Sequence, residues 1–316
     1  MNRAFDAIST RDAFGKALFR LAEKDKTIMY IAADTLKSVG GTLFHNKYPE
    51  RAINVGISEQ NMALMAAGMA SCGAKVFIAS YAVFASMRIC EQIRTFICYP
   101  NLDVKIIAGL GGLTGGQEGV THQGIEDIGV LRSIPNLVIV EAADAASTEV
   151  ITEAIAAYSG PVYLRLGRNV SAKVFDEKYR FKIGKANILK ADGVDAAVFA
   201  TGAAVVRAKE ACEKLTSQGR SVQLIEMPCI KPLDEEAVIR AAQETDLVIT
   251  VEDHNIIGGL GTAVSEVLSE KRPARIVRIG IRDQFTESGD HEELLDKYNL
   301  HPDYIAGCIE DKIREK

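Results

Sequence analysis

A glutamate stands where a predicted strand gives way to a predicted helix. It is Glu59, in residues 54–62 (NVGISEQNM). Met62, Met65 and Met69 recur downstream at helical spacing, and the residues just upstream resemble the end of an apolar strand. A carboxylate in the first turn of a helix is ordinarily a surface group that the N-terminal amides stabilise. Beside a Met- and Ala-rich helix face, the same group is suited to share a proton with a bound molecule.

A second group of chemically capable residues occupies positions 115–127 (GGQEGVTHQGIED). Glu118, Thr121, His122 and Gln123 follow one another in a glycine-rich loop, and together they offer donors and acceptors for several hydroxyl groups. The loop comes after a predicted strand that ends near Ala108, which is where open α/β sheets place their ligands. Glycines let the backbone turn tightly and approach a substrate closely.

Aromatic side chains follow another predicted strand, at Tyr81 and Phe84. Two interpretations stay open for them. Both rings fill the core, or one of them stacks on a flat ligand, which contributes roughly 0.5–1.5 kcal/mol beyond the burial of its area.

Strand-like and helix-like runs alternate along the whole chain. Apolar runs predict strands at 27–32, 52–55, 76–79, 104–108, 137–140 and 162–166, and again at 196–201, 222–227, 247–251 and 275–279. Such continuous Val/Ile/Leu runs are typical of parallel sheets covered on both faces. We therefore predict two doubly wound α/β domains, at 1–180 and 181–316, with the more polar stretch 169–193 around their boundary.

Composition excludes several classes of protein. The 316 residues carry a formal net charge of −5 and no polybasic run, so nucleic acid is not an expected partner. No apolar stretch is long enough to cross a bilayer, and the N-terminus lacks a signal core. The six cysteines show no Cys-x-x-Cys pair, which predicts reduced thiols in a cytoplasmic protein and no metal site on this chain.

The segment around Glu59 resembles the cofactor-binding helix of the transketolase family, whose enzymes use thiamine diphosphate. The resemblance implies that Glu59 hydrogen-bonds N1′ of the aminopyrimidine ring, while Tyr81 or Phe84 packs on that ring. It also implies that Asp34 lies near the cofactor and that Ser38 can reach a substrate phosphate. In this family the cofactor supplies the carbanion chemistry, and the protein supplies geometry and proton placement.

The same resemblance assigns the residues that face a sugar. His122 would contact oxygens of a ketose and act in acid–base steps. Glu118 stands where transketolases usually carry an aspartate, and Leu110 stands where many carry a histidine that touches the donor sugar. These departures leave the donor open, with branched, deoxy or sulfonated ketose phosphates or their analogues as candidates. Arg168 resembles a family arginine that binds a sugar phosphate, and Arg165 is its nearest competitor. A second interpretation stays open, in which Arg168 caps the domain junction.

One half of a complete transketolase is missing from the sequence. The family's signature for Mg²⁺ and the cofactor diphosphate is Gly-Asp-Gly with a following asparagine, and the sequence contains no such triplet. An enzyme of this type needs the metal to neutralise the diphosphate. Residues 251–261 (VEDHNIIGGLG) resemble the family's C-terminal domain, so the resemblance covers the pyrimidine-binding and C-terminal portions. We expect an N-terminal subunit to provide the Mg²⁺ site in an α2β2 assembly.

These observations predict the C-terminal subunit of a two-chain transketolase, which moves a two-carbon ketol unit from a ketose to an aldose. One alternative is the β chain of a thiamine-dependent 2-oxoacid dehydrogenase, although the loop from Glu118 to Gln123 resembles the sugar-facing transketolase loop. A deoxyxylulose-phosphate synthase is disfavoured because those enzymes normally carry all three domains on one chain. The alternative of another class is a non-catalytic interaction subunit, against which the presence of Glu59 and His122 counts.

Overall fold

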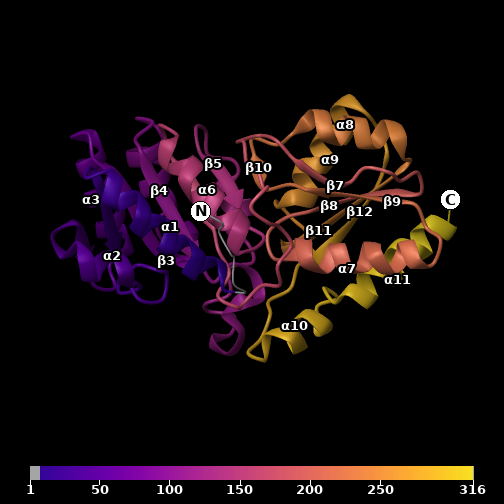
Figure 1. Ribbon diagram of the computed structural model, residues 1–316, viewed down its shortest axis with the longest axis horizontal. Helices are drawn as coiled ribbons and strands as arrows, with labels where there is room; N and C mark the ends of the chain where they lie inside the picture. Colours follow the sequence, from indigo (N-terminus) through magenta and orange to yellow (C-terminus); the bar gives the residue numbers. More distant parts are fainter. Residues whose placement is uncertain (1–7, 316) are drawn as a thin grey trace.

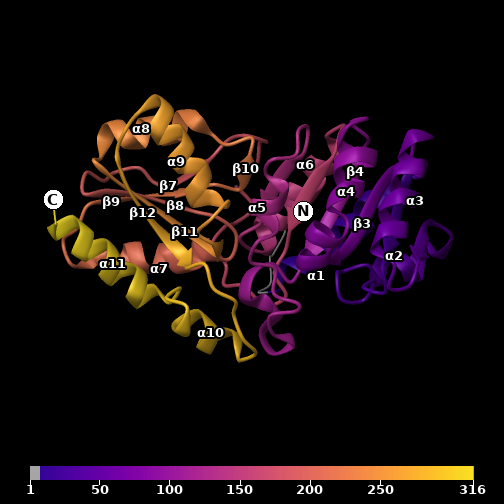
Figure 2. The same ribbon diagram turned by 180° about the vertical axis from the view of Figure 1, so that it is seen from behind.

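The computed structural model describes residues 8–315 as two α/β domains that lie side by side (Figure 1). Each domain has a largely parallel sheet with helices on both of its faces (Figures 1 and 2). The predicted fold class is therefore confirmed. Apolar side chains fill the space on both sides of each sheet, as expected for strands without hydrophobic–polar alternation.

The first sheet has seven strands in the order β10-β5-β6-β4-β3-β1-β2. Six come from the first half of the chain: β1 (Ile28–Ala32), β2 (Ala52–Asn54), β3 (Lys75–Tyr81), β4 (Val104–Gly109), β5 (Val138–Glu141) and β6 (Val162–Arg165). All pairings among these six are parallel. Parallel pairing brings their carboxyl ends to one edge of the sheet, where ligands bind in open α/β folds.

Helices and short turns cover this sheet. They are α1 (Thr10–Lys24), α2 (Thr42–Lys47), η1 (Pro49–Arg51), α3 (Glu59–Ser71), the π-helical η2 (Phe84–Arg88), α4 (Cys90–Gln92), the π-helical η3 (Ile93–Cys98), η4 (Gly112–Glu118), α5 (Asp127–Leu131) and α6 (Ala145–Ala157). Helix α1 begins at Thr10 because the Ser9 hydroxyl caps it by accepting a hydrogen bond from the Asp12 amide. Its apolar stripe packs on α6.

The second sheet has five strands in the order β12-β11-β8-β9-β7. The elements of the second half of the chain are β7 (Asn187–Lys190), β8 (Ala196–Ala200), α7 (Ala204–Ser217), β9 (Val222–Glu226), β10 (Cys229–Lys231), α8 (Glu235–Glu244), β11 (Leu247–Asn255), α9 (Leu260–Lys271), β12 (Arg275–Ile281), α10 (His291–Lys297) and α11 (Pro302–Arg314). Strand β10 leaves this domain and pairs antiparallel with β5 of the first sheet. The second half of the chain thus contributes an edge strand to the first sheet.

Ten predicted strands are present, and two more were missed. Strand β7 lies within the predicted boundary stretch 169–193. The sequence does not indicate it, because its mostly half-exposed residues form no apolar run. Strand β10 is only three residues long. Strand β11 continues to Asn255, beyond the predicted end, through Glu252, Asp253 and His254, all of them buried.

Candidate active site

The predicted site residues lie where parallel strands of the first sheet end. Glu59 follows β2, Tyr81 ends β3, Leu110 follows β4 and Arg168 follows β6. Asp34 follows β1. These strands are neighbours in the sheet, so chain turns that are far apart in sequence meet along one edge.

Glu59 is the first residue of α3 and is only 3% exposed. One guanidinium nitrogen of Arg88, Nη1, lies 3.3 Å and 3.4 Å from its two carboxylate oxygens. The same guanidinium lies 4.4 Å from the centroid of the Phe84 ring, and its side chain is 47% exposed. Arg88 was not among the residues predicted from the sequence. The available signal was its position four residues after Phe84, which places the two side chains on one face of η2.

Three rings meet beside this ion pair. The centroids of Tyr81 and Phe84 are 6.1 Å apart, and the His122 ring lies 5.6 Å and 5.5 Å from them. The Thr121 hydroxyl lies within hydrogen-bond distance of His122 Nδ1, at 2.9 Å. The structure therefore brings His122, from the loop after β4, to the aromatic residues after β3. The three half-buried rings form a wall, and its Phe84 ring contacts the arginine that pairs with Glu59.

Glu118 and Arg168 form an ion pair at the rim of a hollow of about 420 Å³. The first domain lines this hollow with the loop after β4 and with Asn169, and the second domain lines it with residues 289–291. Sequence reasoning did not include His291, because its contact with this loop spans 178 positions of the chain. Arg165, the competitor for the phosphate role, is 1% exposed and cannot reach the hollow.

Three predicted residues lie outside both groups. The Asp34 side chain accepts from Asn54 Nδ2 at 3.4 Å, and the Ser38 carbonyl accepts from Arg11. Leu110 is 3% exposed, so its side chain packs inside instead of facing the hollow. Their roles toward cofactor and substrate stay predictions.

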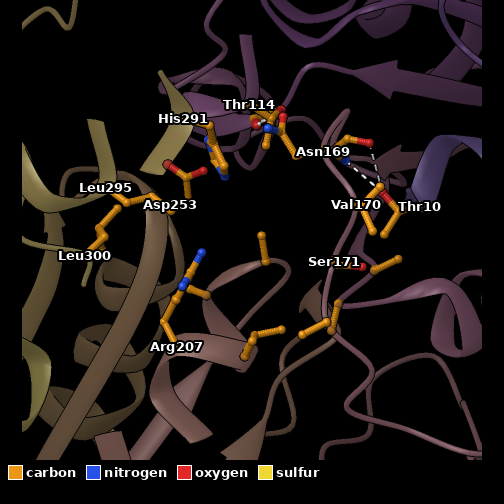
Figure 3. Close-up of a pocket in the computed structure, with 18 of the residues that line it drawn as sticks. Thr10, Thr114, Asn169, Val170, Ser171, Arg207, Asp253, His291, Leu295 and Leu300 are labelled. Atoms are coloured by element: carbon orange, nitrogen blue, oxygen red, sulfur yellow. Dashed lines mark hydrogen bonds between the residues drawn. The ribbon is translucent and has the colours of Figure 1, made fainter. Parts of the chain in front are cut away.

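A separate cavity of about 230 Å³ lies between the domains. Figure 3 shows Asp253 and His291 side by side at one of its walls, with Thr114 of the first domain nearby and Arg207 opposite. Neither Glu59 nor His122 lines this cavity. Within residues 8–315, no helix is long and apolar enough to span a membrane, and no group of three His, Cys, Asp or Glu side chains could hold a metal ion.

Comparison with known proteins identifies both domains. Residues 6–172 match the family model "Transketolase, pyrimidine binding domain", and residues 184–305 match "Transketolase, C-terminal domain". A 6-deoxy-6-sulfo-D-fructose transketolase subunit from Clostridium sp. is 38% identical, over 97% of this chain and 95% of that protein. A subunit of the apulose-4-phosphate transketolase of Phocaeicola vulgatus is 37% identical, over 96% of this chain and 97% of that protein.

Solved structures give the same answer. A split-gene transketolase, described as an inactive beta4 tetramer, superposes with a TM-score of 0.88 at 39% identity, covering 98% of this chain and 99% of that one. Transketolase from Campylobacter jejuni shares the fold, with a TM-score of 0.81 at 22% identity, over 98% of this chain and 48% of that one. The chain belongs to the transketolase family, as the C-terminal (beta) subunit of a split transketolase.

Proposed function

We propose that this chain provides the aminopyrimidine-binding side and the sugar-facing loop of a two-chain, thiamine-diphosphate-dependent transketolase. The reaction transfers a two-carbon ketol unit from a ketose phosphate or analogue to an aldose. One observation carries the proposal: a buried glutamate, two aromatic rings and a histidine from three separate chain segments converge at one sheet edge.

The residues present fit the aminopyrimidine end of the cofactor. Glu59 offers a buried carboxylate whose partner in this chain, Arg88, lies at the long end of hydrogen-bond distance. Tyr81 and Phe84 offer aromatic faces for a flat ring. An N-terminal partner subunit would bind Mg²⁺ and the diphosphate, because this sequence does not contain the Gly-Asp-Gly signature with its following asparagine.

Glu59 would hold a proton at N1′ of the aminopyrimidine, and its position at the start of α3 aims it from a rigid element. When bound, thiamine diphosphate supplies the carbanion chemistry of ketol transfer. His122 would donate hydrogen bonds to oxygens of the sugar and move a proton there. Because His122 packs edge-on against Phe84, its ring reaches the space next to the pyrimidine wall.

The hollow beside Glu118 and Arg168 is suited to the end of a ketose that lies away from its carbonyl group and carries the acidic group. Arg168 would bind an acidic end group in bidentate fashion, and Glu118 would accept a hydrogen bond from a sugar hydroxyl. Two relatives are named for a sulfonated sugar and for a sugar phosphate, both of which carry an acidic group. We propose a donor of that general class for this chain.

Exposed apolar side chains on the elements next to Glu59 support a partner subunit. Ile57 is 78% exposed and Tyr99 is 85% exposed, while Met87 and Phe96 on η2 and η3 are also exposed. Apolar side chains grouped on a protein surface commonly mark an interface. An N-terminal subunit seated here, in an α2β2 assembly, would cover them and close the site over Glu59.

Copurification tests the proposal. The tagged chain is purified from its native host under native conditions, and its partners are identified by mass spectrometry. We expect a stoichiometric partner with Gly-Asp-Gly and a downstream asparagine. The reconstituted pair, with thiamine diphosphate and Mg²⁺, should transfer ketol units from a sulfonated or phosphorylated ketose.

The same experiment decides between the proposal and its alternatives, which the comparisons do not favour. A lipoyl-bearing acyltransferase in the complex would establish the 2-oxoacid dehydrogenase. A stoichiometric pair without ketol transfer would establish the non-catalytic subunit.

A further inference from the structure

The loop that carries Glu118 and His122 begins and ends in the hydrophobic core of the second domain. We call residues 113–125 the substrate loop. The side chains of Leu113 and Ile125, at its two ends, are 0% and 2% exposed. Both belong to the apolar cluster formed by the second sheet with α7 and α11, and not to either cluster of the first sheet.

Backbone groups at the two ends are also bonded to the second domain. The Leu113 amide lies 3.0 Å and 3.1 Å from the two carboxylate oxygens of Asp253, and the Leu113 carbonyl lies 3.3 Å from His291 Nδ1. Figure 3 shows Asp253 and His291 side by side, with Thr114, the residue after Leu113, near them. The Ile125 carbonyl accepts a 2.8 Å hydrogen bond from the Asn255 amide. Buried polar groups held in this way leave the ends of the loop little freedom.

The preceding residue is adapted to the same contact. Gly112 has φ +64, and a Cβ atom built on it would lie 2.1 Å from Asp253 Oδ2. Any other residue would push the carboxylate away from the Leu113 amide and would strain the backbone. The close approach of the two domains at this point therefore depends on a glycine at position 112.

A third attachment lies directly beside His122. The side chain of Gln123 is 1% exposed, and its oxygen accepts a hydrogen bond from the Thr286 hydroxyl. Its amide nitrogen donates to the Glu287 carbonyl at 3.1 Å and to the Gly116 carbonyl at 3.3 Å. Thr286 and Glu287 follow β12, so the second domain fixes the residue that comes directly after His122 in the chain.

Arg165 connects the substrate loop to the second domain by hydrogen bonds to both. Its Nη2 donates to the Gly124 carbonyl at 2.6 Å and to the Asp253 carbonyl at 3.0 Å. Its Nε donates to Asp127 at 3.0 Å, and its Nη1 pairs with Glu141. One buried guanidinium thus links the end of the substrate loop to the strand that carries Asp253.

We infer that the second domain positions the substrate loop, with Thr286 and Asp253 as positioning residues for His122 and Glu118. The inference rests on the proposed function for the role of the loop. It gives the second domain a part in sugar recognition, although that domain supplies no group to the pyrimidine wall. Displacement of the loop alters contacts with the donor, whereas Glu59, Arg88 and Phe84 stay on elements of the first domain.

The test replaces one hydroxyl. Thr286→Val keeps the volume of the side chain and removes the donor to Gln123. Thr250→Val is the matched control, because Thr250 is fully buried in β11 and its hydroxyl has no hydrogen-bond partner among the described residues. Hydrogen exchange is measured on peptides covering the substrate loop in the full chain. Donor kinetics and thiamine-diphosphate affinity are measured on the complex with its partner.

We expect loop amides of Thr286→Val to exchange about tenfold faster, and kcat/KM for the donor to fall about tenfold. Cofactor affinity should stay unchanged, and Thr250→Val should match the wild type in all three measurements. Unchanged loop exchange in Thr286→Val, or an equal effect in Thr250→Val, would overturn the inference. A wild-type complex without ketol transfer would overturn the proposed function, while the exchange data would still decide whether the second domain holds the loop.

Discussion

The two sides of the substrate loop are built in opposite ways. We call the side with Glu59, Arg88 and His122 the open side. There, Glu59 has one long contact, to a half-exposed Arg88, and His122 packs on rings that are themselves half exposed. We call the side that packs on the second domain, with Arg165 and Asp253, the domain side. There, Arg165 is 1% exposed, and both of its terminal nitrogens and its Nε donate hydrogen bonds. The chain thus supplies the partners of Arg165 itself, whereas Glu59 and His122 have few polar contacts within the chain.

This difference separates two kinds of residue. Under the proposed function, a bound cofactor and a partner subunit would complete the contacts of the groups on the open side. On the domain side, each of the three guanidinium nitrogens of Arg165 has a partner, and this matters because a buried polar group without a partner costs free energy. Substitutions on the open side should therefore change catalysis more than stability. Substitutions on the domain side should lower stability and should affect catalysis only by displacing the substrate loop.

Glu59→Gln should have the largest effect. The amide is close in shape to the carboxylate but cannot take up a proton, so the complex should lose about 10²–10⁴-fold in kcat. Unfolding of the chain should barely change. The measurement is ketol transfer by the assembled complex, with Glu23→Gln, an exposed glutamate on α1, as the control. Activity equal to wild type would mean that the open side is not catalytic.

His122→Gln should follow, with a fall in kcat of about 10²-fold. Glutamine can still hydrogen-bond a sugar oxygen, but it cannot move a proton at that position. The measurement is steady-state ketol transfer, and the control is His45→Gln, an exposed histidine on α2. A change in the KM of the donor without a change in kcat would reduce His122 to a binding residue.

Arg168→Gln should act on the donor alone. It removes one charge-assisted contact, so the KM of a phosphorylated or sulfonated ketose should rise about tenfold. Steady-state kinetics should show this loss for acidic donors only, with Arg180→Gln, an exposed arginine nearby in the chain, as the control. An equal loss for a ketose without an acidic group would exclude binding of the end group by Arg168.

Local patterns in the sequence were sufficient for ten of the twelve strands of the described residues and for the position of Glu59 at the start of α3. Continuous apolar runs predict ten strands, because parallel strands are buried on both faces. The position of Glu59 follows from the switch between strand and helix periodicity on either side of it. Neither inference needs knowledge of distant contacts.

The domain side could not be predicted in the same way. Thr286 bonds Gln123 across 163 positions, and Asp253 bonds Leu113 across 140. No periodicity connects such pairs. Arg88 was missed for a different reason, since its contact with Glu59 depends on how the π-helical turn of η2 directs the side chain. Strand β10 was missed because three residues carry too little pattern.

The smallest effect is expected in the second domain, far from the open side. Glu226 on β9 is fully buried, where the Tyr179 hydroxyl and the Asn187 side-chain amide donate to its carboxylate. Burial raises the pKa of Glu226 from 4.5 to about 8. Between these pH values the folded chain keeps a proton that the unfolded chain has released. The free energy of unfolding should therefore fall as the pH rises from about 5 to 8.

Glu226→Gln removes this titration. Denaturant unfolding at pH 5, 6.5 and 8 should show the wild type losing on the order of 3 kcal/mol more than the variant across this window. Glu213→Gln, an exposed glutamate on α7, should keep the wild-type slope, and kcat of the complex should stay unchanged in both variants. Parallel slopes for wild type and Glu226→Gln would show that this carboxyl is charged in the folded chain. A change in kcat would show that the two regions are coupled through the second sheet, because the hydrogen bonds of Glu226 go to Tyr179 and Asn187 and not to the substrate loop or the open side.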